Sequence, residues 1–240
     1  MSNAELPFKF GRLPAMRPAA LSDLSVYTTG KLPEPPKEVS VPAGAYPIDG
    51  NDKYGDCTMA GVAHLIEAWN AVYAKRVPVP SDQQVVDEFL KLNGGQTDVG
   101  LSEAQVLSLW HKSGLFGDKI AGYAPVSDRD ILGIHQAIAE YGGCYLGIQC
   151  PESAQEQFQN HQPWTYVPGS PLEGHCIVGL GYNEKYVECA TWGGIAKVTY
   201  PFLAHYLEEV WVIISQQLVE AKQNNLGVDL QALQEDLEKV

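Results

Sequence analysis

The sequence is short of basic residues, with 16 Lys and Arg against 29 Asp and Glu and a formal net charge of −13. Because binding to a phosphate backbone depends on clustered Lys and Arg, this balance argues against a nucleic-acid partner. Residues 1–11 lack an apolar run of signal-peptide length, and no other stretch approaches the roughly 18 apolar residues of a membrane helix. We therefore expect a cytoplasmic chain without a membrane partner.

Cysteine is scarce, odd in number and without the Cys-x-x-Cys spacing of many zinc and redox sites. Four of the five cysteines, Cys144, Cys150, Cys176 and Cys189, lie in mostly apolar, strand-like surroundings, where a thiol packs as a small hydrophobic side chain. We therefore expect reduced thiols, no disulfides, and no metal or other cofactor. The fifth, Cys57, begins a helical pattern instead.

The 240 residues are 45% hydrophobic and 19% charged, which is enough for one domain with a substantial core. Residues 1–45 form a proline-rich extension that we expect to lie extended on the surface. Residues 46–215 carry the periodic patterns of a folded domain. Residues 216–240 form a polar tail, in which the spacing of leucines after Gly227 predicts a terminal helix capped by Asp229.

Apolar residues recur with helical spacing in four segments of the first half of the chain. The predicted helices span residues 57–75, 81–92, 102–113 and 131–141. Short polar side chains cap helix N-termini, and Asp56 and Ser81 are the predicted caps of the first two helices, while Ser127 or Asp128 is the predicted cap of the fourth.

The second half of the chain changes to short apolar runs separated by Gly, Pro and Asn. The predicted strands span residues 144–148, 175–182, 186–192, 196–200 and 210–214. Helices followed by strands predict an α+β fold with a helical lobe and an antiparallel sheet lobe. A cleft between two such lobes is a natural place for a ligand.

Cys57 at the start of a predicted helix and His175 in a predicted strand favour thiol chemistry when taken together. A helix N-terminus and an imidazolium neighbour both stabilise a thiolate, so the pair predicts a nucleophile and its base. A charged Asp56 beside the sulfur would oppose this ionisation unless it turns away to cap the helix. His64 is two helical turns, roughly 10 Å along the axis, beyond Cys57, and we expect it to be a packing residue.

The order of motifs between about residues 42 and 214 resembles the papain-like cysteine peptidases. Residues 51–57 are similar to the family's Gln-Gly-x-Cys-Gly-Ser-Cys-Trp segment, with Cys57 at the nucleophile and Asn51 at the glutamine of the oxyanion hole. Further similar segments are 99–115, 122–125, the histidine-bearing strand 174–182 and the following strand 186–193. The resemblance implies a papain-like two-lobe fold in which the nucleophile helix packs on the antiparallel sheet lobe.

The chain departs from the family at the residue that orients the catalytic histidine. When Trp192 is aligned with the family's Asn-Ser-Trp-Gly motif, Ala190 falls at the asparagine, and alanine cannot hold an imidazole. Thr191, through a one-residue loop difference, and Glu188, on the strand face of Ala190, are the candidate orienting residues. Thr58 replaces the tryptophan that follows the family's nucleophile.

The resemblance implies hydrolysis of a peptide, isopeptide or other amide bond through an acyl-enzyme on Cys57. We expect the cleft to be lined by Gly174, Trp164 and Trp192, with Trp192 shielding the histidine from water. The extension before the nucleophile is short and proline-rich, so no inhibitory propeptide is expected.

Two other functions stay open at this point. A papain-fold binding or scaffold protein whose chemistry has decayed is favoured by Ala190, Thr58 and Asp56. An acyl transferase would use the same residues, because the acyl-enzyme is common to hydrolysis and transfer.

Overall fold

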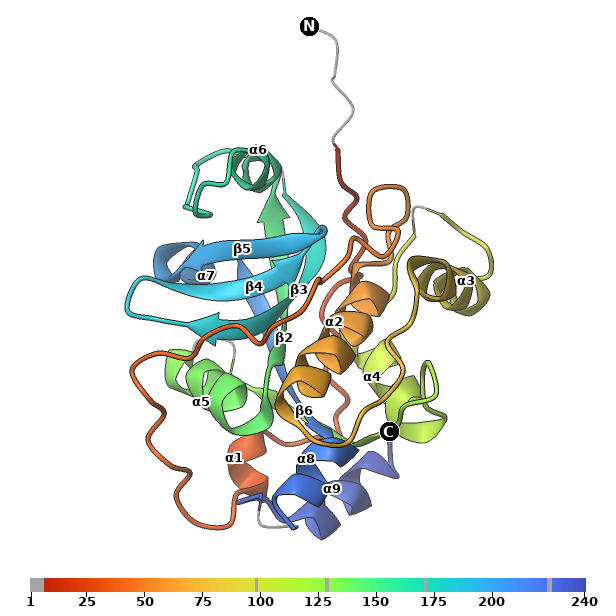
Figure 1. Cartoon of the computed structure of the whole chain (residues 1–240), viewed down its shortest axis with the longest axis vertical. Coiled ribbons are helices and arrows are strands. Elements are labelled where there is room, and N and C mark those ends of the chain that lie inside the picture. The colour runs from red at the N-terminus through yellow and green to blue at the C-terminus, as the bar shows by residue number, and fades with distance from the viewer. Residues whose placement is uncertain (1–6, 98, 128–129, 171, 224–225) are drawn as a thin grey trace, which may run out of the picture.

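The fold is built on one antiparallel sheet, shown by a computed structural model that describes residues 7–97, 99–127, 130–170, 172–223 and 226–240 (Figure 1). The strands of these residues are β1 (Ile120–Val126), β2 (Cys144–Pro151), β3 (Leu172–Tyr182), β4 (Tyr186–Thr191), β5 (Gly194–Thr199) and β6 (Leu207–Ser215). Their order in the sheet is β1-β6-β2-β3-β4-β5, and each neighbouring pair is antiparallel. The predicted α+β class is therefore confirmed.

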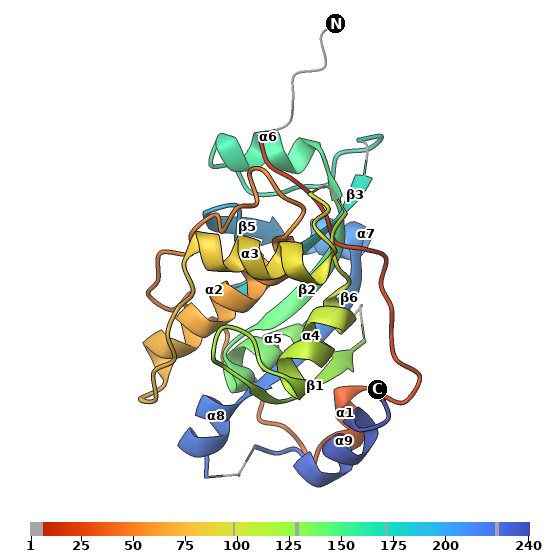
Figure 2. The same cartoon turned by 90° about the vertical axis from the view of Figure 1, so that its right-hand side faces the viewer.

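Helices cover this sheet and fill the loops between strands. In the described residues they are α1 (Leu24–Tyr27), α2 (Cys57–Val72), α3 (Asp82–Leu92), α4 (Glu103–Lys112), α5 (Ile131–Tyr141), α6 (Ser153–Gln159), α7 (Tyr200–Tyr206), α8 (Gln216–Ala221) and α9 (Leu230–Leu237). Helix α2 packs on β3 and β4, and α3 and α4 lie beside it on the side away from β5 (Figures 1 and 2). This arrangement is the predicted helical lobe packed on a sheet lobe.

Local signals explain most of these elements. Ser81 and Ser102 each accept a hydrogen bond from the backbone three residues later, and a glutamine reaches back to complete a capping box at α3 and at α4. Asp229 caps α9 as predicted, by accepting a hydrogen bond from the Ala232 N–H. The predicted strands all exist, with ends that differ by a few residues.

Two predicted caps were wrong. The Asp56 side chain makes no capping bond at α2 and is fully buried, and its backbone carbonyl accepts from the first turn instead. Helix α5 is capped by Asp130, whose carboxylate accepts from the Gly133 N–H. The predicted alternatives were Ser127 and Asp128, and Asp128 lies outside the described residues.

Strand β1 was not predicted, because its sequence contains Pro125 and is typical of a turn. The strand lies at the edge of the sheet, where β6 is its neighbour, and an edge strand tolerates a residue without a backbone N–H.

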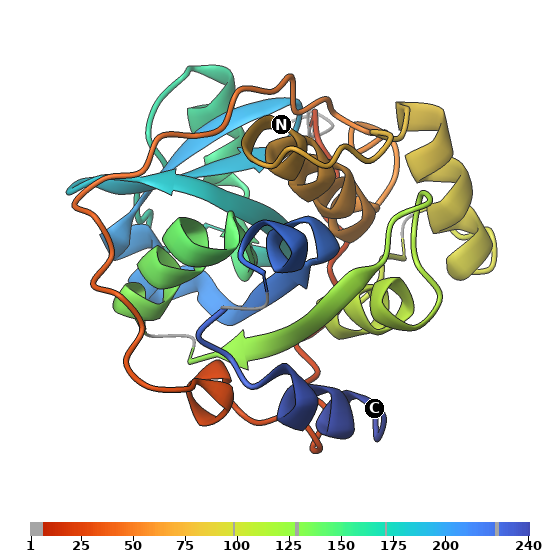
Figure 3. The ribbon, with the colours of Figure 1, turned by 60° about the horizontal axis from the view of Figure 1, so that its bottom comes forward.

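The C-terminal tail packs onto the body beside the chain's own N-terminal region. Leu233 and Leu237 of α9 are buried against β1, where a Cβ on Gly122 would meet Leu233. Tyr27 of α1 donates a hydrogen bond from its hydroxyl to Asp236 at 2.8 Å. Figure 3 shows α1 and α9 side by side next to β1.

The N-terminal extension lies on the surface as predicted over residues 13–20 and 28–45, whose side chains are exposed or half-buried, but the prediction missed several buried side chains elsewhere in it. Phe10, Arg12, Leu21, Leu24 and Tyr27 are all buried. The physical reason is that apolar and basic side chains of this segment have partners in the sheet and in α9, which proline content alone does not reveal. Among the described residues, no helix has the length and apolar character needed to cross a membrane.

If α9 is an integral part of the fold, removing Leu233 must cost global stability. Leu233→Ala deletes a side chain with 0% exposure and is expected to lower the free energy of unfolding by about 2–5 kcal/mol, measured by urea unfolding. Gln231→Ala, at an exposed position of the same helix, is the control and should change it by less than about 0.5 kcal/mol. Equal, small effects would show that α9 docks too weakly to matter.

Candidate functional site

Cys57 is the first residue of α2, and its thiol lies against the neighbouring strand β3. The side chain is 2% exposed, and the backbone N–H of Cys176 faces the sulfur. Burial raises the pKa of the Cys57 thiol to about 12, while the Cys176 N–H acts in the opposite direction. In the state described here the thiol is therefore protonated at neutral pH.

Two polar residues surround the approach to this helix N-terminus. Asp56 is fully buried, and burial raises its pKa to about 8, opposed in part by hydrogen bonds from its own backbone and from the Asn51 amide. Asn51 is 2% exposed and donates from its side-chain nitrogen to the Tyr54 carbonyl at 2.9 Å. Asn51 and Cys57 line the same small cavity, of about 10 Å³, which is space for at most about one water molecule.

His175 lies in β3 and is held by a single polar side chain. Its Nε2 is 2.8 Å from the Thr191 hydroxyl, and its Nδ1 has no hydrogen-bond partner among the described residues although it is fully buried. Burial, followed by the positive charge of Arg12, lowers the pKa of His175 to about 3. The imidazole is therefore neutral at physiological pH in this state.

Strand register explains why Thr191, and not Ala190 or Glu188, meets the imidazole. Ala190 pairs with Val178 across the strands, three residues from His175 and hence on the other face of β3. Alternation then puts Thr191 on the face of His175. Glu188 shares the face of Ala190 and pairs with Gly181, so the structure does not bring it to the histidine.

Aromatic rings cover the histidine. Trp192 stacks on His175 with ring centroids 4.6 Å apart, as expected for a residue that shields the imidazole. Phe8 stacks on the same indole at 5.0 Å, and Phe10 meets the edge of His175 at 5.7 Å. Trp164 was expected to line the cleft, but it is fully buried behind Trp192, because it also packs on Phe202 of α7.

Residues 8–13 run across this site between the two lobes (Figure 1). On the sheet side, the backbone N–H groups of Gly11 and Arg12 both donate to the Gly174 carbonyl, at 3.0 and 2.9 Å. On the helical side, the Leu13 N–H donates to the Leu101 carbonyl at 3.2 Å. We expected no inhibitory segment before Cys57, and the structure instead places these residues over the site.

The segment fits because the slot is lined by glycines. A Cβ on Gly11 would lie 2.2 Å from the Gly55 carbonyl oxygen, and a Cβ on Gly100 would lie 1.4 Å from the Gly11 oxygen. Gly174 is equally tight, since its Cβ would lie 2.1 Å from the Arg12 oxygen. Only backbone without side chains allows the two lobes and the segment to approach this closely. Gly174, predicted to line the cleft, thus lies directly against Gly11 and Arg12.

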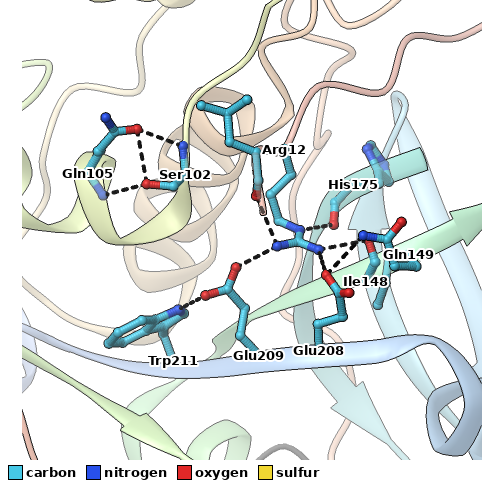
Figure 4. Close-up of polar contacts among 10 residues, drawn as sticks. Arg12, Ser102, Gln105, Ile148, Gln149, His175, Glu208, Glu209 and Trp211 are labelled. Atoms are coloured by element: carbon cyan, nitrogen blue, oxygen red, sulfur yellow. Dashed lines mark hydrogen bonds and ion pairs between the residues drawn. The ribbon is translucent and has the colours of Figure 1, made fainter. Parts of the chain in front are cut away.

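Arg12 extends from this segment into the base of the cleft (Figure 4). Its side chain is 0% exposed and forms ion pairs with Glu209, at 2.7 Å, and with Glu208. The guanidinium also donates to the His175 carbonyl at 3.3 Å and to the Ile148 carbonyl at 3.3 Å. Five polar acceptors from three strands and from the segment itself thus surround one cation, since the Leu13 carbonyl completes the set.

A third carboxyl group lies close to the same cation. Glu103, at the start of α4, is fully buried, and burial raises the pKa of its carboxyl well above the usual range, with the charge of Glu209 as the next cause. The Cys176 thiol is the polar group that faces it, and no stronger donor in the described residues reaches either carboxyl oxygen. Glu103 thus connects the Arg12 cluster to the strand that bears His175.

The residues that analysis of the sequence overlooked are Arg12, Phe8, Phe10, Glu103 and Glu209. Phe8 and Phe10 alternate with polar residues, which is the period of an extended chain with one buried face. Glu209 directly precedes the apolar run of β6 and is buried with it, and a buried charge marks a position that has a partner. His64, predicted to be a packing residue, is 2% exposed; its Nε2 is 2.8 Å from the Pro47 carbonyl and 3.3 Å from the buried Asp49 carboxyl, and it lines the same cavity as Cys57.

All five cysteines are free, as expected, and Cys57 is buried like the four for which burial was predicted. In the described ranges, no group of three or more His, Cys, Asp or Glu side chains has the arrangement to hold a metal ion.

No protein-family model matches the sequence, and no curated protein matches it. Solved structures do resemble it. Xylellain, a cysteine protease from Xylella fastidiosa, is 17% identical with a TM-score of 0.68, and the match covers 90% of this chain and 99% of that chain. The cysteine protease CMS1MS2 from Carica candamarcensis, solved in complex with E-64, is 14% identical with a TM-score of 0.54, covering 75% and 99%.

A third similar structure contains the cysteine protease and lectin-like domains of Cwp84, a surface layer associated protein of Clostridium difficile. It is 10% identical with a TM-score of 0.55, and the match covers 89% of this chain and 57% of that chain. All three similar structures include a cysteine protease. The chain therefore has the fold of the papain-like cysteine proteases.

Proposed function

We propose that this chain is a cysteine hydrolase that cleaves an amide bond in a peptide or isopeptide, with Cys57 as the nucleophile and His175 as the base. The observation that supports the proposal is the hydrogen bonding of the two ring nitrogens of His175. Its Nε2 is engaged by Thr191, so the buried and unpartnered Nδ1 is the nitrogen left to accept a thiol proton. Cys57 lies at a helix N-terminus against the residue that follows this histidine.

In the first half of the proposed reaction, Nδ1 of His175 accepts the Cys57 proton and the sulfur attacks the amide carbonyl carbon. The tetrahedral intermediate collapses, the C–N bond breaks, and His175 returns the proton to the leaving amine. In the second half, His175 deprotonates water, which attacks the thioester and releases the acid and the free thiol. The Thr191 hydroxyl keeps the ring oriented throughout.

The oxyanion of the intermediate needs hydrogen-bond donors. The Cys57 backbone N–H is one candidate, because the first N–H groups of a helix have no partner within the helix. The Asn51 amide is the second candidate. One of its two N–H bonds goes to the Tyr54 carbonyl, and the other, which faces the Asp56 carboxyl in this state, would turn to the oxyanion.

The burial of Cys57 and His175 also keeps both side chains in their uncharged, unreactive forms. Desolvation holds Cys57 as a thiol and His175 as a neutral imidazole, and Phe10 and Phe8 contribute to that burial by covering His175 and Trp192. We propose that residues 8–13 leave the site before turnover. Water and substrate then reach the pair, and the thiolate–imidazolium form becomes accessible.

Uncovering the site should activate Cys57. Gly11→Val introduces a Cβ into a space only 2.2 Å from the Gly55 oxygen and is expected to expel the segment. We expect iodoacetamide to alkylate Cys57 at least tenfold faster in this variant than in wild type, with labelling that persists below pH 7, measured by intact mass. Ala15→Val, at an exposed position of the same extension, is the matched control and should behave as wild type.

The double variant Gly11→Val/His175→Ala tests whether His175 acts as the base. Loss of the labelling below pH 7 in this variant supports the pair. Labelling that follows an ordinary thiol titration near pH 8.5 whether or not His175 is present would falsify the hydrolase and leave a binding or scaffold protein on the same fold.

Thr191 is expected to orient the base. In the Gly11→Val background, Thr191→Val removes the hydroxyl bonded to Nε2 and should lower kcat/KM for cleavage of an unfolded protein substrate by roughly tenfold or more, the equivalent of one lost hydrogen bond. Thr191→Ser keeps the hydroxyl and should retain activity within a few-fold. If serine and valine variants are equally active, the hydroxyl does not position the histidine.

Asp56 should be neutral beside the nucleophile and should make stability depend on pH. Its folded-state pKa, about 8, lies above the unfolded value of about 3.9, so its contribution to stability is fully present below pH 4 and is lost as the pH rises to 8. Over this window wild type should lose up to about 1.4 kcal/mol per pH unit through this group. Asp56→Asn should flatten the dependence measured by urea unfolding at pH 5 to 8.

Asp52→Asn, at a partly exposed neighbouring position, is the control for this measurement. The prediction fails if the pH dependence of the free energy of unfolding runs parallel in wild type and Asp56→Asn.

A further inference from the structure

We infer that the pocket filled by Arg12 is a substrate pocket, and that it selects peptides with an arginine or lysine side chain. This inference rests on the proposed hydrolase and specifies its substrate class. Residues 8–13 then occupy the site as a built-in competitor, and Arg12 takes the place of the substrate's basic side chain.

The groups that line the pocket are hydrogen-bond acceptors, and a cation supplies the donors that they need. Glu209 and Glu208 contact the guanidinium, with side-chain exposures of 9% and 35%, and the carbonyls of His175 and Ile148 contact it from the sheet (Figure 4). These groups only accept hydrogen bonds, and a guanidinium only donates them. Glu103 adds a third, fully buried carboxyl near the same cation.

The pocket also adjoins the reacting groups. One of its acceptors is the backbone carbonyl of His175 itself. Another of its walls is Glu103, which faces Cys176, and the Cys176 N–H faces the Cys57 sulfur. A side chain in this pocket therefore belongs to a peptide whose backbone passes the nucleophile.

The backbone of residues 8–13 shows how such a peptide would be held. Its contacts with Gly174 and Leu101 are hydrogen bonds between backbone groups, and the amide of Gln155 likewise bonds to both the N–H and the carbonyl of Phe8. Any extended peptide has the same donors and acceptors. Glycines lining the slot admit a backbone without requiring a particular sequence. Side-chain selection then falls to the pocket below.

Selectivity follows from what the pocket would do with the wrong side chain. A neutral or acidic side chain would leave the buried Glu209 carboxylate without its cation, and an unpaired buried charge is strongly unfavourable. Discrimination therefore arises from rejecting other side chains as well as from binding a basic one.

The first experiment compares peptidyl vinyl sulfones that differ only in one side chain. In these probes the Cys57 sulfur bonds to the alkene carbon β to the sulfone, which is attached to the peptide, and the carbon that bears the sulfone takes the proton. Arginine, its neutral isostere citrulline, and leucine are placed one, two or three residues from the vinyl group, and labelling of the full-length Gly11→Val chain is followed by mass. We expect the arginine probe at one of these positions to label at least tenfold faster than citrulline and leucine.

The second variant tests whether the carboxylate is the source of the preference. Gly11→Val/Glu209→Gln keeps an acceptor for the Trp211 indole N–H, which bonds to Glu209 at 2.9 Å, and removes the charge. We expect the arginine preference to fall to within about threefold. Glu184→Gln, the same substitution at an exposed position before β4, is the matched control and should leave the preference unchanged.

A binding measurement that needs no catalysis uses the full-length Arg12→Ala chain, in which the pocket is vacated by a single truncation. Millimolar N-ethylguanidinium should raise the Tm of this variant saturably, whereas the neutral N-ethylurea should not. Neither compound should raise the Tm of wild type or of Arg12→Ala/Glu209→Gln. Equal effects of the two compounds would overturn the cation pocket.

The failure of this inference and that of the hydrolase are distinguishable. Iodoacetamide labelling that depends on His175, together with equal rates for the arginine, citrulline and leucine probes, overturns the substrate class and leaves the hydrolase. Absence of labelling that depends on His175 overturns the hydrolase and the substrate class with it, whatever N-ethylguanidinium does to Arg12→Ala.

Discussion

The burial of one positive charge, that of Arg12, is the constraint on which the arrangement of this protein depends. A guanidinium with 0% exposure has to be neutralised and hydrogen-bonded where it lies, and here the partners come from β2, β3 and β6. Removing one partner of such a buried pair typically costs about 3–5 kcal/mol. The ion pairs of Arg12 therefore hold residues 8–13 in the groove between the lobes. They also fix where the aromatic rings of that segment lie.

The exclusion of water from the groove also sets the pKa values of the groups in the site. Desolvation disfavours the charged form of every group, so it raises the pKa of Cys57 and lowers that of His175 at the same time. The two shifts together remove the ion pair that a thiol hydrolase needs. In the mechanism we propose, a segment that excludes water from the pair would control its reactivity without a hydrogen bond of its own to the sulfur.

In the function we propose His175 is the base, and its surroundings differ from those of the papain-like peptidases. The chain has alanine where the papain-like peptidases carry the orienting asparagine, and that substitution alone would suggest lost chemistry. Strand alternation, however, brings the next residue, Thr191, to the imidazole at 2.8 Å. Trp192 then stacks on the ring and completes a histidine environment that is buried, oriented and open at Nδ1.

The sequence by itself determined the helices and strands that local patterns specify, because periodicity and capping act between residues a few positions apart. The caps Ser81, Ser102 and Asp229 illustrate this, whereas the pairing of Cys57 with His175 stays a prediction. Only the tertiary structure decided that residues 8–13 occupy the groove and that Arg12 meets Glu209, 197 positions away. Such a contact depends on the register of three strands and on the space that glycines leave between two lobes, and no local pattern encodes either.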